Sequence, residues 1–130
     1  MESTSTRSTR SRALVPGAVA VVALHLAALY WPSVDIVGPV SWTDKVVHLL
    51  LFAVPTYAVG LALRSVWPAV VVFALHAPLS ELIQQRLLTY RSGDVWDAVL
   101  DLVGVGAGAA LLLVQRQPNR PGRGALGLPD

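Results

Sequence analysis

The chain of 130 residues contains no cysteine and few charged side chains. The absence of cysteine excludes a disulfide framework and a thiolate-bound metal ion. Only 14% of the residues are charged and 54% are hydrophobic, whereas about 25% of the residues of a typical soluble domain are charged. This shortage of charge, together with a mean hydropathy of +0.57, indicates that the chain folds in a lipid bilayer. Its length allows one domain with a few membrane spans.

Four long apolar segments dominate the chain, at residues 13–31, 44–63, 66–85 and 95–114. Each approaches the roughly 20 residues that an α-helix needs to cross about 30 Å of hydrocarbon. The first is longer than the apolar part of a cleaved signal peptide and ends in LYWP rather than in small residues, so we expect it to be retained as a span. Pro55, inside the second segment, predicts a kink, which is tolerated where a neighbouring helix covers the freed carbonyl group.

The connections between these segments are short, which makes neighbouring helices antiparallel. We therefore predict an all-α fold, an integral membrane four-helix bundle formed by residues 13–114. Residues 1–12 are rich in Ser, Thr and Arg, and residues 115–130 in Pro, Gly and Arg; we expect both tails to be disordered. Aromatic side chains near the segment ends predict anchors at the membrane surface: Tyr30, Trp31, Trp42, Trp67 and Trp96.

Lysine and arginine are distributed unevenly between the two sides of such a bundle. One side has seven of them: Arg7, Arg10, Arg12, Arg64, Arg116, Arg120 and Arg123. The other side has three: Lys45, Arg86 and Arg91. Because cytoplasmic segments carry the excess of Lys and Arg, we expect both termini to be cytoplasmic and the protein to be a multi-pass protein of the cell membrane. Topology and contact with lipid headgroups account for the arginines of the tails, so no nucleic-acid partner is expected.

Nearly every ionisable group within or beside the apolar segments falls at their extracytoplasmic ends. The second segment begins with Asp44, Lys45 and His48, and Asp44 and His48 share a helix face because they are four residues apart. The remaining polar residues at this level belong to the third and fourth segments and to the loop between them: Glu81, Gln84, Gln85, Arg91, Asp94, Asp97 and Asp101. The sequence therefore predicts one polar site near the outer membrane surface.

The last segment carries a stripe of acidic and small residues at intervals of three or four. Its outer part is acidic, with Asp94, Asp97 and Asp101, and its inner part contains Gly104 and Gly108. Glycines four residues apart let another helix approach closely, so we expect them to pack against a helix of the same chain. A stripe that continues into such a packing surface is expected to face the interior of the bundle.

Two interpretations of these charges are open. The acids and bases can neutralise one another and hold the helices together, which is the usual arrangement of charges within a membrane. Alternatively, they line an outward-facing polar site for a ligand. Four carboxylates face two or three cations: Glu81, Asp94, Asp97 and Asp101. This surplus favours shared protons, a bound cation or a cationic ligand, and so a binding site.

These residues resemble the pattern of the VanZ-like family, named for an accessory protein that lowers sensitivity to the glycopeptide teicoplanin. The pattern includes Asp-Lys-x-x-His-x-x-x-Phe, then Glu-x-x-Gln, then an Arg shortly before Asp-x-x-x-Asn-x-x-Gly-x-x-x-Gly. The resemblance covers residues 44–108 and is carried by Asp44, Lys45, His48, Phe52, Glu81, Gln84, Arg91, Asp97, Gly104 and Gly108. Asp101 stands where the family usually has Asn, and we expect it to be protonated or paired with Lys45 or Arg91.

The resemblance implies an integral membrane protein of the bacterial cell envelope, with some members linked to glycopeptide tolerance. From the residues themselves, Lys45 and Arg91 suit a phosphate or carboxylate group, and His48 with Glu81 or Asp97 suits proton transfer. We therefore expect membrane lipid as a partner, with a cell-wall precursor, a lipid-linked or peptide ligand, or a glycopeptide-related ligand at the site. An oligomer is compatible with the sequence, and no cofactor is expected.

Two alternative functions remain open. A membrane-embedded hydrolase or transferase acting on a lipid phosphate or envelope precursor would use the N and O ligand set of His48, Glu81, Asp97 and Asp101 for a metal ion, although no strong metal motif such as HExxH is present. A small proton-coupled transporter would extend a proton path through His76 and His25. We expect each of these two histidines instead to be neutral and hydrogen-bonded to a neighbouring helix.

Overall fold

The computed structural model describes residues 3–31, 42–88 and 95–117, and these residues form four helices without a strand. The helices are α1 (Ser3–Tyr30), α2 (Thr43–Leu63), α3 (Val66–Leu87) and α4 (Val95–Arg116). Each contains a stretch that is long and apolar enough to cross a membrane, which in α1 is Ala13–Tyr30. The predicted all-α fold, with four helices long and apolar enough to span a membrane, is confirmed.

Helix α1 begins at Ser3, well before the apolar segment that starts at residue 13. Residues 3–12 are thus helical, and our expectation of disorder for them differs from the structure. Extending an existing helix costs much less than nucleating one, so the apolar segment can propagate a helix into a Ser, Thr and Arg-rich sequence. At the other terminus, α4 ends at Arg116, and residues 118–130 lie outside the described part of the chain.

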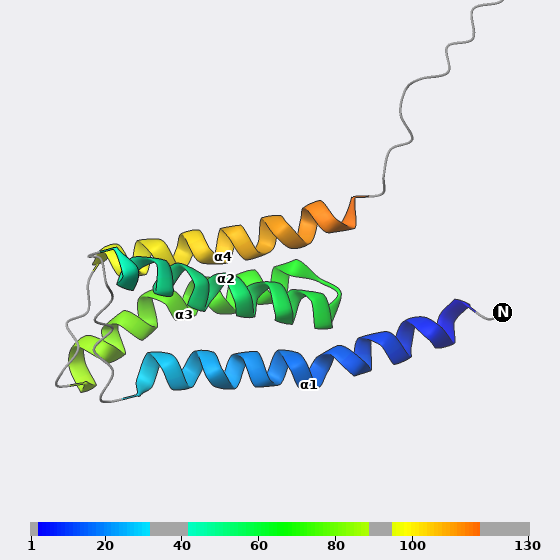
Figure 1. Ribbon diagram of the computed structural model, residues 1–130, viewed down its shortest axis with the longest axis horizontal. Helices are drawn as coiled ribbons and strands as arrows, with labels where there is room; N and C mark the ends of the chain where they lie inside the picture. Colours follow the sequence, from blue (N-terminus) through cyan, green and yellow to red (C-terminus); the bar gives the residue numbers. More distant parts are fainter. Residues whose placement is uncertain (1–2, 32–41, 89–94, 118–130) are drawn as a thin grey trace, which may run out of the picture.

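Successive helices run in opposite directions (Figure 1). The start of α1, the turn between α2 and α3, and the last turn of α4 lie at one end of the bundle, which we call the Arg64 end. The last turns of α1 and α3 and the first turns of α2 and α4 lie at the opposite end, the polar end. Helix α2 contacts each of the other three helices, whereas α1 and α4 have no contact within the described residues.

Two glycines allow α4 to lie directly against α2. A Cβ atom added to Gly104 would overlap the carbonyl oxygen of Leu49, and one added to Gly108 would overlap that of Ala53. Both obstacles are backbone atoms of α2, which cannot move aside as a flexible side chain can. The glycines therefore act at an intramolecular interface, the place that their spacing predicts.

The outer surface of the bundle is rich in large apolar side chains, as a lipid environment requires. More than half of the accessible surface of Leu24, Leu75 and Val95 is exposed. Four tryptophans near the helix ends are also 58–70% exposed: Trp31, Trp42, Trp67 and Trp96. These positions match the anchors predicted from the sequence.

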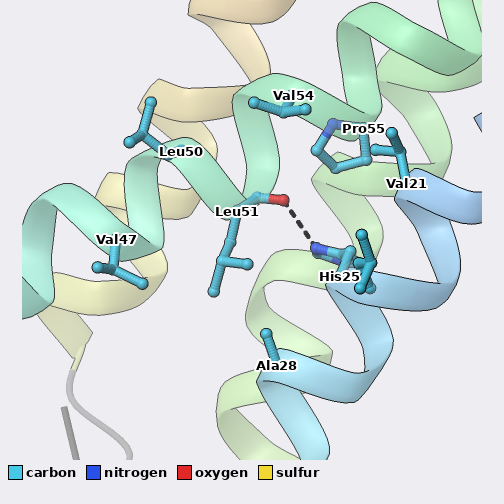
Figure 2. A pocket seen from close by; sticks show the side chains of 9 residues that line it. Val21, His25, Ala28, Val47, Leu50, Leu51, Val54 and Pro55 are labelled. Atoms are coloured by element: carbon cyan, nitrogen blue, oxygen red, sulfur yellow. Dashed lines mark hydrogen bonds between the residues drawn. The ribbon is translucent and has the colours of Figure 1, made fainter.

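A hydrogen-bonded chain through α1 and α3 repairs the backbone defect that Pro55 creates in α2. Proline has no N–H group, so the carbonyl of Leu51, four residues earlier, lacks its helical partner. His25 of α1 donates from Nδ1 to this oxygen over 2.7 Å. Figure 2 shows the bond, with His25 directed from α1 toward the backbone of α2. A neighbouring helix thus covers the carbonyl that Pro55 frees, as predicted.

The chain continues beyond His25. Because a carbonyl can only accept, His25 donates from Nδ1, and its Nε2 accepts from Nδ1 of His76 over 3.1 Å. Nε2 of His76 in turn accepts from the hydroxyl of Tyr30 over 2.8 Å. Both imidazoles are satisfied in the neutral state, as we expected. Tyr30, which the sequence suggested to be a surface anchor, instead completes this interior chain.

We expect His25→Leu to destabilise the protein by about 1–3 kcal/mol, because the substitution leaves the buried carbonyl of Leu51 without a partner. In a Pro55→Ala background, the restored N–H of residue 55 takes over this carbonyl, and His25→Leu should cost less. Thermal unfolding of the four proteins of this cycle in detergent measures the coupling between the two sites. Tyr30→Phe, which removes only the hydrogen bond from Tyr30 to His76 at the other end of this hydrogen-bonded chain, is the control. Equal costs of His25→Leu in the two backgrounds would contradict the repair of this defect by His25.

Candidate functional site

Seven polar side chains meet at the polar end, where α2, α3 and α4 adjoin. Helix α2 contributes its first two turns, α3 its last turns and α4 its first two turns. We call these residues the polar cluster: Asp44, Lys45, His48, Glu81, Gln84, Asp97 and Asp101. They come together because α2 and α4 both begin, and α3 ends, at this end of the bundle (Figure 1). Each side chain then reaches the interface through its position on the helical repeat.

His48 lies at the centre of the polar cluster and is only 5% exposed. Its Nδ1 lies 3.1 Å from Oδ1 of Asp101, a hydrogen bond, and 3.8 Å from Oε1 of Glu81. Its Nε2 lies 3.9 Å from Oδ1 of Asp44 and 4.0 Å from Oδ2 of Asp97. Carboxylates from three helices thus surround both nitrogens of one imidazole.

Lys45 forms the outer rim of the cluster. Its Nζ donates to Oδ1 of Asp97 over 3.2 Å, and its side chain is 42% exposed. Of the states expected for Asp101 (protonated, or paired with Lys45 or Arg91), the structure shows neither pairing among the described residues, and Asp101 lies against His48 instead. Depth explains the difference: Lys45 and Asp97 lie in the first turns of their helices, and His48 and Asp101 lie one turn deeper.

The inner part of the cluster is buried and incompletely hydrogen-bonded. Asp101 is fully buried, and Gln84 is 3% exposed. Among the described residues, Oδ2 of Asp101 and Nε2 of Gln84 have no hydrogen-bond partner. Such groups are rare in folded proteins because each costs roughly 1–3 kcal/mol. A bound group that formed hydrogen bonds with these two atoms would gain the most binding free energy in the cluster.

Burial distinguishes the two adjacent glutamines of α3. Gln84 faces the interior with Glu81, whereas Gln85 is exposed. Arg91 and Asp94, which we also expected at the site, lie outside the described residues. Of the described candidates, all seven gather in the polar cluster.

A second feature is a shallow groove of about 430 Å³ between α1 and α2. Figure 2 shows its lining, which consists of aliphatic side chains such as Val21, Leu50 and Val54, with His25 at its floor. The only polar group among them, His25, is already committed to Leu51 and His76. The groove therefore offers no free group for chemistry, and its surface matches the surrounding hydrocarbon.

No family model, curated protein or solved structure matches this chain. What the polar cluster can do must therefore be inferred from its own geometry. Within it, two overlapping sets of donor atoms lie within 4.8 Å of one another, as ligands of one metal ion do. The first set is His48, Glu81 and Asp101, all buried, and the second is Asp44, His48 and Asp97. His48 also lies close enough to several carboxylates to exchange a proton with them.

The sequence analysis did not predict that Tyr30 and His25 both contact His76, or that Thr56 is buried. Tyr30 and His25 are five residues apart in α1, a spacing that does not place side chains on one face, so nothing in the sequence predicts that both reach His76. Thr56 is fully buried, and its hydroxyl has no hydrogen-bond partner among the described residues. It follows His48 and Phe52 at intervals of four, which is the signal that could have revealed it.

Proposed function

We propose that this chain is a VanZ-like multi-pass protein of the bacterial cytoplasmic membrane, and that its polar cluster binds the polar group of an envelope ligand. The candidate ligands are a lipid-linked cell-wall precursor, a lipid headgroup and a peptide, and binding would alter sensitivity to teicoplanin. The observation that carries this proposal is that the polar motif residues within the described part of the chain gather in one cluster with a buried interior. The contact of His48 with Asp101, for example, joins residues that are 53 positions apart in the sequence.

The charge of the cluster supports binding over purely structural pairing. Four carboxylates, those of Asp44, Glu81, Asp97 and Asp101, surround one lysine and one histidine. A ligand that brings hydrogen-bonding groups or positive charge suits the described part of the cluster, in which Oδ2 of Asp101 and Nε2 of Gln84 are buried without a hydrogen-bond partner.

The proposed orientation places the cluster on the outer side of the membrane. Arg64 and Arg116 lie at the Arg64 end, and so does the start of α1, whose first turns contain three arginines (Figure 1). An excess of basic residues at one end favours a cytoplasmic location for that end. The polar end then faces cell-wall precursors, and the rim residues Asp44 and Lys45, both with side chains 42% exposed, provide access.

The geometry gives less support to a proton-coupled transporter. The chain from Tyr30 through His76 and His25 ends on a backbone carbonyl, which cannot pass a proton onward. The metal-dependent hydrolase or transferase stays a second candidate, because His48, Glu81 and Asp101 offer three buried donor atoms within 4.8 Å of one another.

The proposal predicts a change in antibiotic sensitivity that depends on the cluster. Expression of the protein in a teicoplanin-sensitive bacterium should raise the inhibitory concentration of teicoplanin several-fold, and substitutions in the cluster should abolish this rise. The variants are His48→Gln, Glu81→Gln and Asp97→Asn. Each removes a charge or titratable group with little change in side-chain volume, and immunoblotting of the membrane fraction verifies insertion.

Adjacent glutamines provide a matched control. Gln84→Ala removes a buried amide of the cluster, whereas Gln85→Ala removes an exposed one on the same helix. Only Gln84→Ala should lower the inhibitory concentration. If the wild-type protein leaves sensitivity unchanged, or if all cluster variants behave as the wild type does, the proposed function is wrong.

A further inference from the structure

Three donor atoms from three helices converge in the inner part of the polar cluster. They are Nδ1 of His48, Oε1 of Glu81 and Oδ1 of Asp101, at 3.8 Å and 3.1 Å from the histidine nitrogen. Ligand atoms about 2.1 Å from a tetrahedral metal ion are about 3.4 Å apart. The two observed separations lie on either side of this value, so small side-chain rotations would direct all three atoms at one ion.

The charge and burial of these three groups fit a divalent ion. Glu81 is 8% exposed and Asp101 is fully buried, so two carboxylates face one imidazole deep in the bundle. A divalent cation with two carboxylates and a neutral imidazole makes the trio electrically neutral.

An independent observation also points to a ligand here. The second oxygen of Asp101 is buried and has no hydrogen-bond partner among the described residues. A simple ion pair with His48 accounts for Oδ1 but leaves Oδ2 unexplained. Metal coordination accounts for both oxygens, since carboxylates bind in either monodentate or bidentate fashion.

The outer part of the cluster has the form of a supporting shell for such a site. Metal-bound histidines nearly always direct their other N–H group at a carboxylate, a carbonyl or water. Nε2 of His48 faces Asp44 and Asp97 at 3.9 and 4.0 Å. Asp97 is itself held by Lys45 over 3.2 Å.

We infer that His48, Glu81 and Asp101 bind one divalent transition-metal ion, with zinc as the type that fits the N and O donor set. Three protein ligands leave a coordination position for an oxygen of the ligand, such as a phosphate or carboxylate. This inference rests on the proposed function in one respect: the open position would serve the envelope ligand. The metal site itself depends only on the three donors.

The test is metal binding by the full-length protein, purified without a histidine tag, in detergent, and stripped with a chelator. We expect the wild type to retain one equivalent of zinc after desalting, measured by elemental mass spectrometry. Cobalt(II), used in place of zinc, should give the intense visible absorption of a four-coordinate complex. His48→Gln and Asp101→Asn each remove a ligand and should weaken binding by more than about 100-fold, beyond the 10–100-fold that loss of an outer-shell residue costs.

Gln85→Ala is the control, because it replaces an exposed side chain of α3 outside the polar cluster. It should bind zinc as tightly as the wild type. Circular dichroism and size-exclusion elution verify that each variant is folded. The inference is overturned if the wild type binds no stoichiometric metal, or if His48→Gln and Asp101→Asn bind as the wild type does. Metal binding without any effect on teicoplanin sensitivity would reject the proposed function alone, and an effect without metal would reject this inference alone.

Discussion

Replacing Gly104 with leucine should separate α4 from α2 and prevent most of the protein from folding. Even a single Cβ at this position overlaps the carbonyl oxygen of Leu49 in α2, and it would also lie 3.2 Å from the amide nitrogen of Ala53. Relief requires the two helices to move apart, which opens the interface that carries the polar cluster. We expect a loss of about 3 kcal/mol or more, at the upper end of the range for overpacked interiors.

Gly106 provides the matched control for this substitution. It lies two residues further along α4, is exposed, and has no atom within 4 Å of the position that a Cβ would take. Gly106→Leu adds the same side chain to the same helix, and removing a glycine should raise helix stability by up to about 1 kcal/mol. Monodisperse yield and thermal unfolding in detergent distinguish the two variants. A Gly104→Leu protein as stable as Gly106→Leu would show that α2 and α4 are not in close backbone contact.

The extents of α2, α3 and α4 could be predicted because the thickness of the bilayer sets the length of a helix that crosses it. The expected spans 44–63, 66–85 and 95–114 differ from α2, α3 and α4 by two residues at most. The start of α1 could not be predicted in the same way. Residues 3–12 are polar, and their helical conformation depends on the apolar helix that follows them rather than on any pattern of their own.

The membership of the polar cluster could be predicted for a similar reason. Polar residues are so few in the apolar segments that helical spacing and antiparallel order were enough to bring them to one place. The pairing within the cluster could not be predicted, because it depends on differences in depth of a single turn. Asp97 and Asp101 lie on one face of α4, so their spacing does not distinguish them. In the structure, Asp97 forms an ion pair with Lys45 and Asp101 a hydrogen bond with His48.

The hydrogen-bonded chain from Tyr30 to the carbonyl of Leu51 could be predicted from the sequence only in part. The sequence contains the defect, since Pro55 must free that carbonyl. It does not contain the identity of the donor, because any helix packed on that side of α2 could supply one. The rotation of α1 about its axis places His25 beside the carbonyl of Leu51. Packing against two phenylalanines holds the imidazole, whose centroid lies 4.8 Å from that of Phe52 and 5.4 Å from that of Phe73.

Asp101→Leu should destabilise the protein by about 3–5 kcal/mol, the cost of removing one member of a buried charged pair. His48, which is 5% exposed, would lose its hydrogen bond of 3.1 Å to Oδ1 of Asp101 while still lying among the other carboxylates. Asp101→Asn should cost far less. The amide oxygen of asparagine can still accept from Nδ1 of His48, and the side chain keeps its volume.

The comparison of these two variants separates stability from binding. Asp101→Asn keeps the hydrogen-bond acceptor and the side-chain volume, while it removes one carboxylate ligand of the inferred metal site. We therefore expect a folded protein of near-normal melting temperature that no longer retains zinc. Thermal unfolding of the stripped proteins provides the measurement. If Asp101→Leu is as stable as Asp101→Asn, the bond to His48 does not hold the helices together, and the role of Asp101 lies in binding alone.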